Sequence, residues 1–150
     1  MAFIGRLFVI VFSVFLASIA AGLVIAYGLI GSQWNALSAD AGERAGFWIV
    51  TFAGASFTGA AGLLPLAIAI SISEALKIRS FLLHAVAGAA ILVLGLYSSG
   101  LARPSYEESI DFAPPMIARE TEIAAAAGVV FGVVYWLLAG RKAGRWRERP

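Results

Sequence analysis

Long apolar runs with almost no charge inside them fill most of this chain. The four runs are Leu7–Gly31, Ala45–Ser73, Ser80–Ala102 and Ile123–Gly140. An α-helix rises 1.5 Å per residue, so about 20 residues cross a hydrocarbon core about 30 Å thick, and each run is close to this length or exceeds it. The sequence therefore predicts an all-α fold, an integral membrane four-helix bundle with short loops that forms a single transmembrane domain.

The composition excludes several other classes of protein. The chain has 150 residues, of which 61% are hydrophobic and 13% are charged, whereas soluble domains carry about 25% charged residues. Cysteine is absent, which excludes disulfides, thiolate metal sites and thiol redox chemistry. His84 is the single histidine, so one chain cannot supply both axial ligands of a bis-histidine haem. We expect neither a cofactor nor a metal site.

The basic residues predict the orientation, because Lys and Arg in short loops concentrate on the cytoplasmic side. Eight flank one set of helix ends: Arg6, Lys77, Arg79 and the five within the tail 141–150. Three flank the other set: Arg44, Arg103 and Arg119. This bias places both termini in the cytoplasm and argues against a protein that inserts in both orientations.

The N-terminus also has a rival interpretation as a signal peptide. Arg6 precedes the apolar run, and Ala17-Ser18-Ile19-Ala20 has the small-x-small pattern of a cleavage site. The apolar run continues to Ile30, about twice the length of a typical signal-peptide core. We therefore expect an uncleaved first span, and cleavage would leave three spans.

Small residues recur at four-residue spacing in three of the runs. They are Ser18, Gly22 and Ala26 in the first, Gly54, Thr58 and Gly62 in the second, and Ala124, Gly128 and Gly132 in the fourth. Such stripes let helix backbones approach closely in a membrane. The favoured interpretation is packing among the four helices of one chain. In the alternative, at least one stripe faces another subunit, and leucine at Gly128 and Gly132 would then abolish co-purification of that subunit.

Two single residues stand out within the runs. Pro65 removes a backbone hydrogen bond and its ring clashes with the carbonyl of Ala61, which predicts a kink in the second helix, either a static bend or a gating hinge. His84 lies one turn into the third run, near the predicted cytoplasmic interface. We expect a neutral, hydrogen-bonded histidine there, and the sharper alternative is a proton-relay or ligand site.

The polar segments suggest binding to a partner or to lipid rather than a metal site or catalysis. The third connection carries Glu107, Glu108 and Asp111 but lacks the ligand alternation and turn glycine of a calcium-binding loop, so we expect a solvated or partner-docking loop. The basic tail 141–150 suits anionic lipid. Ten residues offer too little surface for nucleic acid, and we expect none as a partner.

The function is the least constrained property. The sequence holds no nucleotide-binding, protease, kinase or hydrolase motif. Its richness in Ala, Gly, Leu and Arg resembles that of small inner-membrane proteins of high-GC bacteria, so we expect a bacterial inner membrane. We predict a non-enzymatic accessory or assembly subunit that packs against a membrane-protein partner.

Other functions stay open at this stage. The main alternative is a small oligomeric channel or transporter that uses the Pro65 kink and the hydroxyls of Ser56 and Thr58. A lipid-modifying enzyme is disfavoured because the chain shows no convincing acid–base pair, and a holin-like pore-former has only size and the basic tail in its favour.

Overall fold

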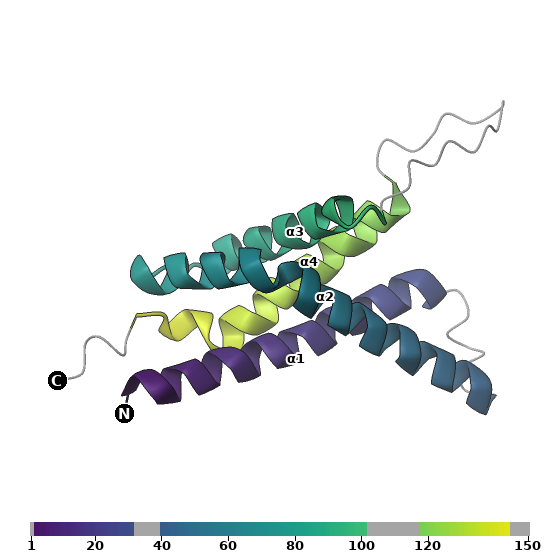
Figure 1. The fold of residues 1–150 in the computed structure, drawn as a ribbon, viewed down its shortest axis with the longest axis horizontal. Coiled ribbons are helices and arrows are strands. Elements are labelled where there is room, and N and C mark those ends of the chain that lie inside the picture. Colours follow the sequence, from purple (N-terminus) through teal and green to yellow (C-terminus); the bar gives the residue numbers. More distant parts are fainter. Residues whose placement is uncertain (1, 32–39, 102–117, 145–150) are drawn as a thin grey trace.

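The computed structural model describes residues 2–31, 40–101 and 118–144 (Figure 1). These residues form four long α-helices and one short 3₁₀ helix, and none of them lies in a strand. The helices are α1 (Ala2–Ile30), α2 (Ala41–Ala75), α3 (Phe81–Ser98), α4 (Arg119–Leu138) and η3 (Gly140–Lys142). The described part of the chain is thus all-helical, as the sequence predicts.

Three helical segments are long and apolar enough to cross a membrane. They are Ile4–Ile30, Phe81–Ser98 and Arg119–Leu138, and α2 makes a fourth if its two halves count as one span. Large apolar side chains cover the outside of these helices, with Phe8 73% and Phe12 61% exposed. Exposed apolar surface on this scale is typical of a protein surrounded by lipid.

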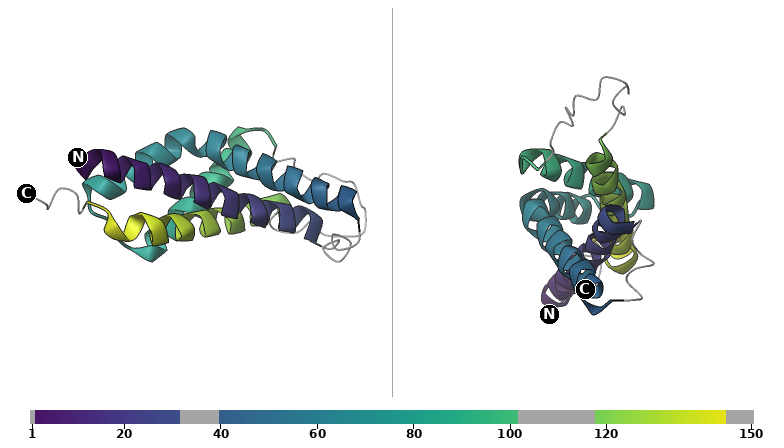
Figure 2. Two further views of the ribbon diagram at one scale, coloured as in Figure 1. Left: turned by 90° about the horizontal axis from the view of Figure 1, so that it is seen from below. Right: turned by 90° about the vertical axis from the view of Figure 1, so that its right-hand side faces the viewer.

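The most extensive helix contacts are between α3 and α4, followed by α1 with α2 and α1 with α4, while α2 and α3 touch over a smaller area. The beginning of α1 and the end of α4 lie at the same end of the molecule (Figure 1). Seen from below, α1 runs alongside the first half of α2 (Figure 2). The core between the helices combines small residues such as Ala21 and Ala127 with Phe131 and Leu92.

Helix α2 begins four residues before the apolar run Ala45–Ser73 and bends before Pro65. Asp40 is its N-cap and accepts a hydrogen bond from the backbone N–H of Gly42 at 3.1 Å, which satisfies one of the free donors of the first turn. Its halves Ala41–Ala60 and Leu64–Ala75 differ in direction by 62°. After this bend the second half lies near α3, and the first half diverges from it (Figure 1).

A tight turn reverses the chain between α2 and α3. Lys77 takes the left-handed conformation with φ 54°, and the N–H of Ile78 bonds back to the carbonyl of Ser73 at 2.9 Å. This is the pattern of a Schellman C-cap, with lysine in the position where glycine is usual. Ser80 then caps α3 by accepting from the N–H of Leu83. The turn makes α2 and α3 antiparallel neighbours.

The helix ends differ from the predicted limits of the apolar runs. Helix α1 begins at Ala2 rather than near Leu7, so it includes Arg6, whose charge is neutralised within the fold. Helix α4 begins at Arg119 and carries Glu120 and Glu122 in its first turn, where acidic groups complement the helix dipole.

Candidate functional site

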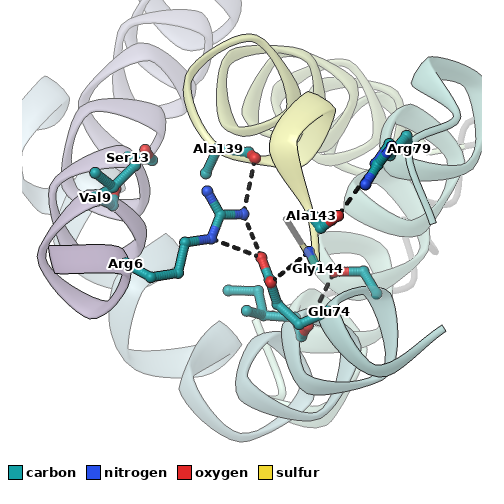
Figure 3. Close-up of polar contacts among 10 residues, drawn as sticks. Arg6, Val9, Ser13, Glu74, Arg79, Ala139, Ala143 and Gly144 are labelled. Atoms are coloured by element: carbon teal, nitrogen blue, oxygen red, sulfur yellow. Dashed lines mark hydrogen bonds and ion pairs between the residues drawn. The ribbon is translucent and has the colours of Figure 1, made fainter. Parts of the chain in front are cut away.

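A buried ion pair joins the beginning of α1 to the end of α2. Arg6 Nη2 pairs with Glu74 Oε1, and Arg6 Nε donates to the same oxygen at 3.0 Å (Figure 3). Both side chains are only 10% exposed. A buried pair of charges is stable only when further hydrogen bonds satisfy the remaining donors and acceptors.

The segment that follows α4 supplies those hydrogen bonds. Arg6 Nη2 donates to the carbonyl of Ala139 at 2.9 Å, and the N–H of Gly144 donates to Glu74 Oε2 at 2.9 Å. We call Arg6, Glu74, Ala139 and Gly144 the clasp. It connects the start of the chain, the end of α2 and the end of the described chain at one end of the molecule (Figure 3).

Sequence reasoning did not find the clasp. Glu74 lies in the short polar connection between two apolar runs, where a solvated carboxylate is the ordinary expectation, whereas the structure leaves that residue 8% exposed. Its partner lies 68 residues away, so no local spacing links the two. One signal was present: Glu74 and Glu148 are the only acidic residues on the basic side of the predicted topology.

The small-residue stripes lie against other helices of the same chain. A Cβ on Gly22 would lie closer than 3.0 Å to the backbone of Thr51, which places α1 against α2. A Cβ on Gly128 would meet the backbone of Gly88 closer than 3.0 Å, and one on Gly132 would meet that of His84, which places α4 against α3.

The other stripe residues whose burial the structure describes lie inside the molecule as well. Ser18, Ala26, Thr58 and Ala124 are buried, and Gly54 lies against Gly22. Leucine at Gly128 and Gly132 would therefore separate α4 from α3 of its own chain. These two substitutions would therefore disturb packing within the chain, and they do not test a contact with another subunit as the sequence led us to expect.

The buried hydroxyls are bonded to their own helices. Ser13 donates to the carbonyl of Val9, Thr51 to that of Phe47, and Thr58 to that of Gly54, at 2.6, 2.9 and 2.8 Å. Ser56, in contrast, is exposed on the other side of α2. Thr58 and Ser56, the two hydroxyls of the channel hypothesis, thus do not line one path within the chain.

His84 lies at the interface of α3 and α4. Its Nδ1 is 2.8 Å from the carbonyl of Ser80, and its ring stacks on Tyr135 with centroids 5.8 Å apart. Within the described part of the chain, His84 Nε2 and the Tyr135 hydroxyl are buried without a hydrogen-bond partner. The same residues contain no group of three His, Asp or Glu side chains arranged to hold a metal ion.

One face of α2 remains open. Ile49, Ala53, Ser56 and Ala60 are all exposed, and their spacing of three and four residues places them on one side of the helix. We call these four residues the outer face of α2. The opposite side, which includes Thr51, packs on α1.

The outer face has the small side chains of a helix-packing surface, but no described helix covers it. Gly46 and Gly59 border it, and no described atom lies within 4 Å of a Cβ built on either one. Trp48 and Phe52 flank it, 52% and 59% exposed, with their rings 6.3 Å apart. Four-residue spacing of small residues does not reveal this stripe, because Ile49 interrupts it.

Some predicted features lie outside the described residues. These are the acidic connection with Glu107, Glu108 and Asp111, the tail beyond residue 144, and the burial of Gly62.

Comparisons with protein-family models, with curated proteins and with solved structures found no match. A function for this chain therefore has to be inferred from its own residues.

Proposed function

We propose that the chain is a non-enzymatic accessory or assembly subunit of a membrane complex, which binds a helix of its partner on the outer face of α2. The carrying observation is that this small-residue stripe is exposed, whereas the stripes centred on Gly22, Gly128 and Gly132 are filled by the chain's own helices. Small side chains allow close helix approach where lipid offers no hydrophobic drive for association. The flanking rings of Trp48 and Phe52 add the aromatic anchors that are common at interfaces.

The hydroxyl groups favour this function over a channel. Thr58 and Thr51 are fully buried and bonded to their own backbone, so they offer no free donor to a passing solute. A channel would have to form between chains, with Ser56 as its hydroxyl. Solute flux into proteoliposomes above that of empty liposomes would support the channel instead.

The partner contact is tested by filling the outer face. Ala53→Leu with Ser56→Leu adds bulk where no described helix packs, so the fold should be unchanged while a partner helix is pushed away. We expect a tagged wild-type chain in mild detergent to co-purify with a stoichiometric membrane protein, and the variant to retain at least tenfold less of it. Mass spectrometry of the eluate measures both.

Matched controls separate this face from exposed surface in general. Ala90 on α3 and Ala126 on α4 are exposed alanines on other helices, and Ala90→Leu and Ala126→Leu should keep the partner at wild-type yield. If the Ala53→Leu, Ser56→Leu variant also keeps the partner at wild-type yield, the outer face is excluded as the contact. A wild-type chain that elutes as a clean homo-oligomer would favour the channel.

We further propose four crossings of a bacterial inner membrane with both termini in the cytoplasm. Two features support this: the start of α1 and the end of α4 lie at one end of the molecule (Figure 1), and five of the seven described basic residues flank the helix ends on that side, whereas Arg44 and Arg119 flank the others. The five are Arg6, Lys77, Arg79, Arg141 and Lys142, with Glu74 as the acidic residue among them. This is the distribution that cytoplasmic ends favour.

Single cysteines test this orientation cleanly because the natural chain has none. Glu43 in the first turn of α2 and Lys142 in η3 are both exposed, and the start of α2 and the end of α4 lie at opposite ends of the molecule (Figure 1). In spheroplasts, a membrane-impermeant maleimide should label Glu43→Cys at once and Lys142→Cys only after permeabilisation. The reverse pattern would invert the proposed topology, and labelling of both would show an even number of crossings between the two positions instead of the proposed three.

A further inference from the structure

A narrow apolar groove lies between the second half of α2 and α3. Its volume is about 260 Å³, and its walls include Leu66 and Ile70 of α2 and Ile91 of α3. Phe131 and Gly132 of α4 form its floor. Almost everything that faces the space is hydrocarbon, so a polar solute would lose its hydrogen bonds to water on entry and gain few in return.

The surroundings of the groove indicate an acyl chain rather than a helix. Ile72 and Leu83 also line the groove and are 48% and 55% exposed, so the groove opens among side chains that face lipid. The short turn between Ala75 and Phe81 joins α2 and α3 at the end of the groove that Ile78 lines, whereas a helix inserted between them would hold their axes roughly 16–20 Å apart. A flexible hydrocarbon chain needs much less width.

The turn between α2 and α3 adds positive charge beside the groove. Ile78 of this turn lines the groove, and its two neighbours in the chain are Lys77 and Arg79. Both are held at this end of the molecule: Arg79 Nε donates to the carbonyl of Ala143 at 3.1 Å (Figure 3), and the stem of Lys77 lies against Gly144. Two basic residues next to an apolar groove complement a molecule with an anionic head and a hydrocarbon tail.

We propose that this site binds one anionic glycerophospholipid, with an acyl chain in the groove and its phosphate at Lys77 and Arg79. The site is distinct from the outer face of α2, which lies on the other half of that helix. The proposal uses the membrane location of the helices and does not depend on the accessory role, so either one can fail without the other.

Native mass spectrometry of the full chain tests the proposal with two lipids of identical chains, phosphatidylglycerol and phosphatidylcholine. We expect one phosphatidylglycerol per chain, retained roughly tenfold over phosphatidylcholine, because two basic residues favour the anionic head. Lys77→Asn with Arg79→Gln should remove that preference; asparagine suits the positive φ at position 77. Arg141→Gln with Lys142→Gln removes two charges at the same end and should leave the preference intact.

The groove itself is tested by filling it. Ala87 lines the groove, whereas Ala90 lies one turn away on the exposed side of α3. Ala87→Phe should lower retention of both lipids at least tenfold, and Ala90→Phe should not. Equal retention of the two lipids by the wild-type chain, or equal retention by the two phenylalanine variants, overturns the proposal.

A measurement on the wild-type chain covers the case in which Ala87→Phe fails to fold. Phosphatidylglycerol with a diazirine in its acyl chain should label groove residues such as Ile70 and Ile91 after irradiation. Labels confined to outward residues of α3, such as Val86, would show a general lipid annulus only and overturn the proposal.

Discussion

Replacing Glu74 with alanine is expected to lower the free energy of unfolding by about 3 kcal/mol. The substitution leaves the Arg6 guanidinium 10% exposed and without its counter-charge, and it removes the acceptor of the Gly144 N–H. An unpaired buried charge is penalised far more than the pair itself stabilises. The measurement is reversible unfolding of the purified chain in mild detergent, followed by circular dichroism.

Three further variants show whether the loss comes from the clasp. Glu43→Ala removes an exposed acidic residue from the first turn of α2 and should change the free energy by less than about 0.5 kcal/mol. Glu74→Gln keeps part of the hydrogen bonding, so its loss of unfolding free energy should lie between those of Glu74→Ala and Glu43→Ala. Arg6→Met with Glu74→Leu replaces both charges by apolar groups and should recover much of the loss. If Glu74→Ala costs no more than Glu43→Ala, the clasp is not a stabilising element.

Alanine at Gly132 is the second substitution with a large expected effect. Its Cβ would lie closer than 3.0 Å to the carbonyl of His84, which is backbone and cannot rotate away. Helices α3 and α4 would have to separate along the largest interface in the molecule, at a cost of about 2–3 kcal/mol. Gly128→Ala meets the backbone of Gly88 in the same way and should have a similar effect.

The matched control is the same substitution on the open side of α2. No described atom lies within 4 Å of a Cβ built on Gly59, so Gly59→Ala should raise stability by about 0.5–1 kcal/mol through the better helix propensity of alanine. In the same unfolding assay, Gly132→Ala is thus expected to lower the free energy of unfolding and Gly59→Ala to raise it. A destabilising Gly59→Ala would indicate that its face is occupied in the purified protein.

Local properties of the fold could be predicted from the sequence. The lengths and apolarity of the four runs predict four helices, and the described residues form four long helices at these places. Each of these depends on residues within a few turns of one another. The bend before Pro65 also lies where the missing N–H predicts a kink, but its 62° angle depends on what each half of α2 packs against.

Contacts between distant segments could not be predicted. Four-residue spacing identifies residues that share one side of a helix, but it does not say which helix covers that side. Gly54 and Ser56 both belong to small-residue stripes of α2, yet Gly54 lies against α1 and Ser56 remains exposed. The place of Glu74 among basic residues singles it out, but no residue spacing identifies Arg6 as its partner, for the same reason.

The clasp can be completed only after the residues that follow α4 have been synthesised. Gly144 follows Glu74 by 70 residues, which at about 5–20 residues per second takes roughly 4–14 s. During that interval Glu74 can meet Arg6 but lacks the hydrogen bond from Gly144, and Arg6 lacks the carbonyl of Ala139. A chain whose translation stops before α4 is finished therefore keeps an incompletely satisfied ion pair between the beginning of α1 and the end of α2.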